Sequence, residues 1–87
     1  MAYRILALPA VRGQMESLPG KVQVRIAARI DGFAETPRPP GSRKMEESGG
    51  EYRVRVGDYR ILYRIDDAAK SILVVRVGHR SDVYRGR

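Results

Sequence analysis

The chain is predicted to be a single α+β domain, in which an N-terminal strand and a helical hairpin precede an antiparallel sheet of three to four strands. Two patterns lead to this fold class. From residue 51 onward, apolar and charged residues alternate with period two, which is typical of half-buried strands. Between residues 21 and 35, apolar residues recur every three or four positions, as on one side of a helix. Because 87 residues can bury only one small core, residues 1–87 are expected to form one domain.

The first half of the chain predicts one strand and two helices. Residues 1–8 alternate weakly and are apolar enough on both sides to lie inside the sheet or under a helix. Residues 10–18 are expected to be helical, with Pro19 and Gly20 ending the run. Residues 21–35 predict the clearest helix, whose apolar stripe should pack on the sheet. This stripe consists of Val22, Ile26, Ile30 and Phe33.

Prolines dominate residues 36–41, which are expected to end the helix and form a connector. Residues 44–45 fit a brief edge strand, and residues 48–50 fit a turn. The two strands that follow are joined only by Gly57 and Asp58, a pair that suits a primed hairpin turn. The hairpin should therefore be antiparallel.

This turn fixes a register that places Arg55 opposite Arg60, where the two positive charges repel each other. It also places Val56 opposite Tyr59, Val54 opposite Ile61, and Arg53 opposite Leu62. A third strand is predicted over residues 71–77. If Leu73, Val75 and Val77 join the apolar face, Arg76 joins the Arg55 and Arg60 face.

The predicted result is a cationic patch of Arg55, Arg60 and Arg76, with Arg53 at its margin. An anionic ligand would convert the repulsion between these arginines into attraction. The alternative is a solvated sheet face whose arginines only keep the protein soluble.

The charge of the chain points to a polyanionic partner. It carries 17 Lys and Arg against 10 Asp and Glu, a net charge of +7, and arginine dominates the basic residues. Arginine suits phosphate oxygens and stacks on bases. Nucleic acid is favoured over membrane because the sequence shows no amphipathic helix with a basic face and a bulky apolar one, although an acidic protein is equally compatible. The absence of cysteine excludes disulfides and thiolate metal sites, and no metal or cofactor is expected. With no apolar run long enough for a membrane span and no signal-peptide pattern, a cytoplasmic location is expected.

Several segments resemble the RelE toxins of type II toxin–antitoxin pairs, within the RelE/ParE superfamily. The most specific are residues 56–63 (Val-Gly-Asp-Tyr-Arg-Ile-Leu-Tyr), residues 65–67 and residues 77–84 (Val-Gly-His-Arg-Ser-Asp-Val-Tyr). The resemblance implies a ribosome-dependent endoribonuclease that cuts messenger RNA without a metal. It also implies a cognate acidic antitoxin, similar to RelB, that blocks the toxin in a heterodimer or heterotetramer.

The resemblance also implies roles for individual residues. Arg60 and Arg80 match arginines that would bind the phosphate charge, and Tyr84 matches a tyrosine that would stack on a base or transfer a proton. Tyr84 could instead pack the tail onto the sheet. Arg53 and Arg55 occupy positions where family members often carry lysines or arginines. With Arg76, they are the expected RNA-binding residues.

The general base stays open, because arginines at positions 53 and 55 remain protonated and cannot readily accept a proton. His79, the only histidine, suits either proton transfer but could equally be a solvent-facing residue at a strand end. Glu46, Glu47 and Glu51 are outside candidates, and solvated surface is the simpler interpretation of them.

Two other functions compete with the ribonuclease hypothesis. One is a ParE-type toxin that inhibits DNA gyrase through protein contact. The other is a non-catalytic basic module that binds RNA or the ribosome, for which charge alone would suffice. His79, Arg80 and Tyr84 favour the ribonuclease.

Overall fold

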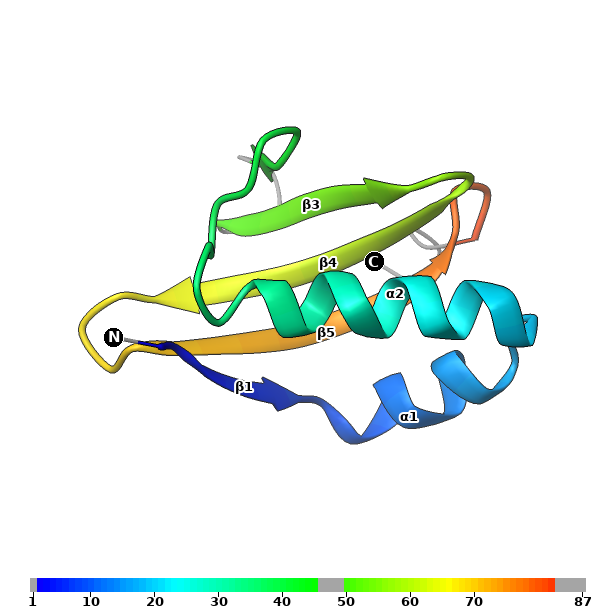
Figure 1. The fold of residues 1–87 in the computed structure, drawn as a ribbon, viewed down its shortest axis with the longest axis horizontal. Helices are drawn as coiled ribbons and strands as arrows, with labels where there is room; N and C mark the ends of the chain where they lie inside the picture. The colour runs from blue at the N-terminus through cyan, green and yellow to red at the C-terminus, as the bar shows by residue number, and fades with distance from the viewer. Residues whose placement is uncertain (1, 46–49, 83–87) are drawn as a thin grey trace.

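The computed structural model describes residues 2–45 and 50–82, which form two helices and one five-stranded sheet (Figure 1). In chain order the elements are β1 (Arg4–Ala7), α1 (Pro9–Glu16), α2 (Gly20–Gly32), β2 (Arg43–Met45), β3 (Glu51–Val56), β4 (Tyr59–Asp66) and β5 (Ser71–His79). The α+β prediction is confirmed. Strands β2 to β5 form a four-stranded antiparallel meander, and β1 adds a fifth strand parallel to β5. The turn expected over residues 48–50 falls mostly outside the described residues.

The β3–β4 hairpin has the register that its two-residue turn predicts. Arg55 pairs with Arg60, Val54 with Ile61, and Val56 with Tyr59. Gly57 has a φ of 61°, whereas Asp58 has no positive φ, which is the pattern of a type II′ turn. The turn therefore needs glycine at its first central position.

The prediction for β5 is half wrong, because this strand carries a bulge. Val74 pairs with Tyr63 while Arg76 pairs with Leu62, so Val75 is an extra residue without a partner on β4. The buried residues before the bulge are Ile72 and Val74 rather than Leu73 and Val75, and the bulge then returns Val77 to the core. The expected placement of Arg76 on the same face as Arg60 is nevertheless confirmed.

The N-terminal strand lies at the edge of the sheet, and the expectation that it would lie inside the sheet or under a helix is wrong. β1 pairs only with β5, over four residues, because Pro9 starts α1 directly after Leu8. Leu6 and Leu8 consequently remain 46% and 41% exposed. Its weak alternation reflects an edge position rather than burial on two sides.

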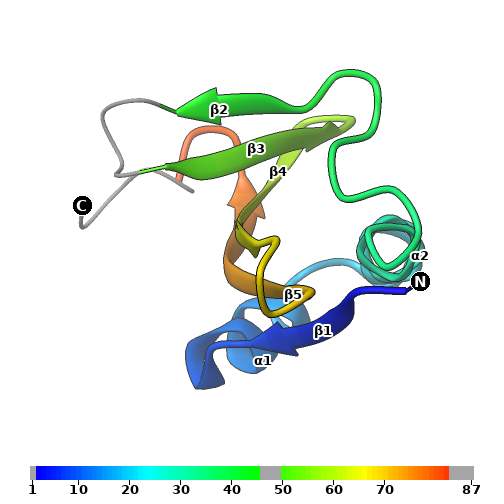
Figure 2. The ribbon, with the colours of Figure 1, turned by 90° about the vertical axis from the view of Figure 1, so that its left-hand side faces the viewer.

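Both helices contribute residues to one core. In Figure 2, α2 lies to one side of the sheet, and α1 lies at its edge, next to β1. The α2 stripe packs as predicted, with Ile26 and Phe33 buried and Val22 and Ile30 partly buried, whereas Val24 points to solvent. β1 covers only the first part of the β5 edge, and beyond the end of β1 the helix α1 lies against β5. There, the Gln14 side-chain oxygen accepts a hydrogen bond from the Val77 N–H at 2.9 Å.

Candidate functional site

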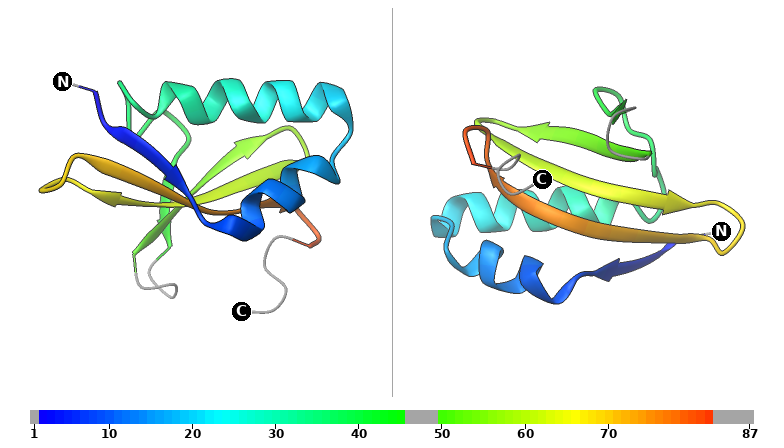
Figure 3. Two further views of the ribbon diagram at one scale, coloured as in Figure 1. Left: turned by 90° about the horizontal axis from the view of Figure 1, so that it is seen from below. Right: turned by 180° about the vertical axis from the view of Figure 1, so that it is seen from behind.

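Among the described residues, six arginines lie on the face of the sheet opposite the helices, and we call it the arginine face. Seen from behind, β3, β4 and β5 lie in front of α2, with no described helix covering them (Figure 3, right). Cross-strand pairing assigns the following residues to this face: Arg43, Arg53, Arg55, Arg60, Arg64 and Arg76. The predicted patch is thus confirmed as a shared face, and β2 adds Arg43, which was not predicted.

The arginines form rows across the strands. Arg43 pairs with Arg53, Arg53 with Leu62, and Leu62 with Arg76, so one row crosses four strands. The next row toward the β3–β4 turn contains Arg55 and Arg60. Neighbouring positive charges in such rows repel each other, and an anion with several oxygens, such as a phosphodiester, relieves this repulsion.

Arg60 is the buried member of the arginine face, at 9% exposure. Its Nη1 donates to the Tyr59 carbonyl at 3.1 Å and to the Gly57 carbonyl at 3.3 Å. Both bonds start from Nη1, which is one of the three nitrogens of a guanidinium group with five N–H donors in total. Arg60 is therefore held in place by the backbone of the turn, whereas its partner Arg55 is exposed.

At the far end of the arginine face an acidic residue balances the charge. Glu51 is buried, and its Oε2 lies 3.3 Å from Nη2 of Arg64. This ion pair engages Glu51 and makes it a poor candidate for a general base. Glu46 and Glu47 lie outside the described residues.

Arg80 approaches the same turn as Arg60. Its N–H donates to the Asp58 carbonyl at 2.8 Å, which extends the β5 ladder past the strand end. Its Nε lies 4.0 Å from the Asp58 carboxylate, and both side chains are exposed, so this pair is weak. The turn thus brings Arg60 and Arg80 to one corner of the sheet.

His79 is not part of this corner. It pairs with Tyr59 on the helix side of the sheet, and the two rings meet edge to face at 5.4 Å. The Ser81 N–H donates to Nδ1 of His79 at 3.1 Å, and the Ser81 hydroxyl lies 2.8 Å from the same nitrogen. Because Nδ1 accepts a backbone N–H, a neutral ring carries its proton on Nε2. Tyr84 lies outside the described residues.

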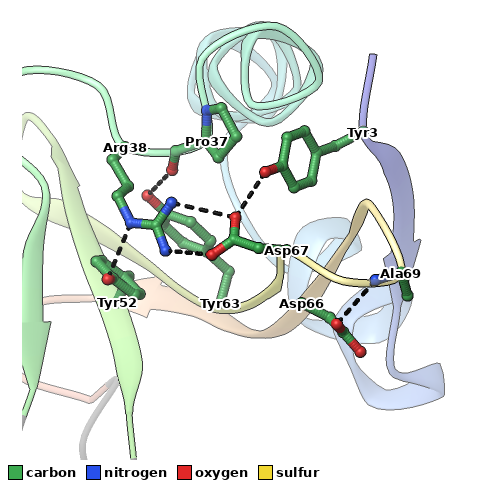
Figure 4. Close-up of polar contacts among 8 residues, drawn as sticks. All are labelled: Tyr3, Pro37, Arg38, Tyr52, Tyr63, Asp66, Asp67 and Ala69. Carbon is green, nitrogen blue, oxygen red and sulfur yellow. Dashed lines mark hydrogen bonds and ion pairs between the residues drawn. The ribbon is translucent and has the colours of Figure 1, made fainter. Parts of the chain in front are cut away.

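A second polar cluster, which the sequence analysis missed, lies at the opposite end of the sheet (Figure 4). Arg38 of the proline-rich connector binds both carboxylate oxygens of Asp67, at 2.9 and 3.3 Å, and its Nε donates to the Tyr52 hydroxyl at 3.0 Å. Asp67 also accepts from the Tyr3 hydroxyl. These bonds lower the pKa of Asp67 to about 2, with the Arg38 contact as the main cause. The cluster ties the connector and the N-terminal segment to the β4–β5 turn.

Tyr63 reinforces this attachment from inside the core. Its hydroxyl donates to the Pro37 carbonyl at 2.8 Å, and its ring stacks on Phe33 at 4.1 Å. Burial raises the pKa of Tyr63 to about 12. This end of the sheet is therefore structural.

The fold is that of the RelE toxins. The structure superposes on the archaeal RelE–RelB complex from Pyrococcus horikoshii with a TM-score of 0.82 and 28% identity, covering 95% of this chain and 100% of that one. The RelBE2 toxin–antitoxin complex from Mycobacterium tuberculosis gives a TM-score of 0.80 at 23% identity, covering 92% and 100% of the two chains.

Sequence comparison places the chain in the same group. A sequence profile described as "ParE toxin of type II toxin-antitoxin system, parDE" matches residues 8–84. Toxin RelG of M. tuberculosis is 34% identical over 98% of this chain and 99% of its own length, and Toxin RelE of the same organism is 25% identical over 95% and 87%. The chain belongs to the RelE/ParE family of type II toxin–antitoxin toxins. In the described part of the chain, neither helix is long and apolar enough to cross a membrane.

Proposed function

We propose that this toxin is a metal-independent endoribonuclease that cuts messenger RNA on the ribosome and thereby stops translation. The observation that supports it most directly is the corner of the sheet where Arg55 and Arg60 face each other and Arg80 contacts the same turn. Three guanidinium groups around one turn suit a phosphodiester that gains negative charge in its transition state. The relatives named RelG and RelE support the same function.

In the proposed reaction the ribose 2′-oxygen attacks the adjacent phosphorus while the bond to the 5′-oxygen breaks, leaving a 2′,3′-cyclic phosphate and a 5′-hydroxyl. Arg60 and Arg80 stabilise the phosphorane charge. The acid that protonates the leaving 5′-oxygen is left unassigned, because His79, the candidate from the sequence, pairs with Tyr59 on the helix side of the sheet and not at this corner. Tyr84 would stack on a base or transfer a proton. The base that removes the 2′-proton is left unassigned, because Arg53 and Arg55 stay protonated.

The proposed partner is an acidic antitoxin in a heterodimer or heterotetramer. The solved structures of P. horikoshii RelE and M. tuberculosis RelBE2 are complexes with their antitoxins. A net charge of +7 favours binding of an acidic chain. The target also implies a cytoplasmic location, because the toxin must reach translating ribosomes.

The test is primer-extension mapping of a translated messenger RNA after addition of purified toxin, with and without ribosomes. Ribosome-dependent cuts are expected, and Arg80→Ala should lower their rate by about 10²-fold or more, as for loss of one transition-state contact. Arg12→Ala removes the same charge from α1, where exposed Arg12 forms an ion pair with Glu16, and should cleave normally. Full cleavage by a folded Arg80→Ala variant would remove Arg80 from the mechanism.

A second candidate function is inhibition of DNA gyrase, which the ParE description of the matching profile favours. An intact messenger RNA combined with inhibited DNA supercoiling would establish this alternative. A non-catalytic RNA-binding module would show neither effect, and its RNA binding would survive Arg60→Lys.

A further inference from the structure

A pocket of about 420 Å³ lies between α2 and the end of β3, next to the β3–β4 turn. Three arginines line it, Arg25 and Arg29 from α2 and Arg55 from β3, and none of the described residues around it is acidic. The rest of the lining consists of Ala28, Val56 and Gly57. The pocket therefore collects positive charges from two elements that are far apart in the sequence.

The helix and the turn bring these arginines to one place. Arg25 and Arg29 are four residues apart, so they lie on the same side of α2. Both terminal nitrogens of Arg25 approach the turn, at 3.6 and 3.8 Å from the position that a Cβ on Gly57 would occupy. Arg55 lines the pocket from β3, two residues before this glycine. The Arg25 guanidinium thus lies where α2 meets the β3–β4 turn.

The charges of this pocket are not neutralised within the described part of the chain. Among residues 2–45 and 50–82, no carboxylate forms an ion pair with Arg25, Arg29 or Arg55. All three residues are exposed, so a ligand can reach them. Like charges four residues apart on a helix repel each other, and a bound anion relieves this repulsion.

The number of oxygens and charges selects the class of anion. A carboxylate has two oxygens, too few to form bidentate pairs with three guanidinium groups. An internal phosphodiester carries one negative charge and leaves most of the positive charge unbalanced. A phosphate monoester carries about −1.5 to −2 at pH 7, and a diphosphate carries more charge and offers more oxygens. The pocket therefore suits a terminal phosphate or a diphosphate best.

We propose that this pocket binds a phosphate monoester or diphosphate group, with Arg25, Arg29 and Arg55 donating to its oxygens. The site goes beyond the proposed function, because it requires no cleavage. The described residues that line it also do not include Arg60 or Arg80, which would stabilise the transition state of that reaction.

The test is an NMR titration of the full ¹⁵N-labelled chain with sodium pyrophosphate at constant ionic strength. The backbone amide signals of Ala28 and Gly57 should shift and saturate, because both residues line the pocket. Dimethyl phosphate, with one negative charge, should bind roughly tenfold more weakly. Unmoved Ala28 and Gly57 signals, or equal binding of dimethyl phosphate, would overturn the proposal.

ADP distinguishes the two sources of a diphosphate group. Tighter binding of ADP than of pyrophosphate would support the proposal with a nucleotide as the ligand. Binding of pyrophosphate that is as tight or tighter would support it with the free anion as the ligand.

A matched pair of double variants tests the arginines of α2. Arg25→Gln/Arg29→Gln should lower pyrophosphate affinity by about tenfold or more, as for the loss of charge-assisted contacts. Arg4→Gln/Arg12→Gln removes the same charge from β1 and α1 and should bind like the parent protein. All four positions are exposed, so both variants should fold, which their spectra check. Equal losses in the two variants would overturn the proposal, because net charge would then explain the binding.

Arg80→Gln tests whether the anion binds at the other side of the turn instead. This variant removes a charge from the corner that holds Arg60 and Arg80, and it should leave the Ala28 titration unchanged. An Ala28 titration that is lost in Arg80→Gln but kept in Arg25→Gln/Arg29→Gln would place the anion at that corner and overturn the proposal. Because binding is measured without RNA, a toxin that cuts no messenger RNA but passes these tests would reject the proposed function and retain the anion site.

Discussion

Arg55 and Arg60 face each other across the hairpin, yet their surroundings differ. Arg55 is exposed, whereas Arg60 is buried and donates to two carbonyls of the turn. A buried charge is tolerated only when hydrogen bonds replace its water, so the turn and Arg60 depend on each other. Arg60 therefore has a structural role besides the proposed catalytic one.

Arg60→Lys separates these roles. A lysine ammonium keeps the charge but lacks the planar fork, so we expect the free energy of unfolding to fall by about 1–2 kcal/mol, the scale of hydrogen bonds to a charged group. Arg55→Lys should change it by less than about 0.5 kcal/mol, as is usual for exposed positions. Urea unfolding of both variants measures the difference. Equal stability would mean that the carbonyl contacts of Arg60 contribute nothing to folding.

Tyr63 makes stability sensitive to alkaline pH. Its pKa is about 12 in the folded protein because of burial, against about 10 in an unfolded chain. The unfolded state therefore releases this proton first, and the stability that neutral Tyr63 provides is lost as pH rises from about 10 to about 12. Tyr63→Phe should be less stable at neutral pH, because it loses the bond to Pro37, but should show a weaker decline in this range.

Urea midpoints measured at several alkaline pH values check this expectation. Tyr59→Phe retains Tyr63 and should follow the parent protein across the range. Parallel declines for the parent and Tyr63→Phe would assign the pH dependence to other groups.

At the scale of elements, the β3–β4 turn has a backbone requirement that substitutions can measure. Gly57 has positive φ, so Gly57→Ala should lower stability by about 1–2 kcal/mol. Gly13 lies inside α1 with no heavy atom within 4 Å of an added Cβ, so Gly13→Ala should raise stability by about 0.5–1 kcal/mol. Thermal or urea unfolding should show changes in stability of opposite sign for the two variants. A stable Gly57→Ala variant or a destabilised Gly13→Ala variant would contradict this backbone argument.

The same elements show what sequence alone can predict. The hairpin register could be predicted from the sequence. With a two-residue turn, only one strand pairing places both Val54 and Ile61 on the core face. The bulge at Val75 could not be predicted from the sequence, because Leu73 and Val75 are as apolar as Ile72 and Val74, which are buried instead. Arg43 was missed because a three-residue strand is too short to show alternation.

Contacts distant in sequence were harder still. Arg38 and Asp67 are 29 residues apart, and only the completed sheet brings them together. The parallel position of β1 likewise depends on a crossover through both helices, which no local pattern specifies.

Across the whole molecule, the two ends of the sheet differ in how far acidic residues neutralise their arginines. At the β4–β5 end, acidic residues neutralise the arginines, as Asp67 does for Arg38 and Glu51 for Arg64. At the β3–β4 end, Arg55 and Arg60 come together beside the weakly paired Arg80. The positive potential is thus concentrated at one corner, where it would attract RNA and set its register.

This arrangement predicts how RNA binding depends on salt. Arg43 and Arg55 are exposed and line one pocket of about 300 Å³ with Arg53, so both should contact phosphates of a single strand. Each lost contact should lower the slope of log affinity against log salt by about 0.7, so Arg43→Ala/Arg55→Ala should lower it by about 1.4.

The measurement is titration of a 2′-O-methyl RNA, which cannot be cleaved, at several salt concentrations. Arg4→Ala/Arg12→Ala removes the same total charge from β1 and α1 and provides the matched control. If net charge alone attracted RNA, both double variants would lose affinity equally and their slopes would coincide. If only the arginine-face variant has a smaller slope, the phosphates bind on that face. The slope reflects released counterions, and counterions are released only where a residue contacts a phosphate.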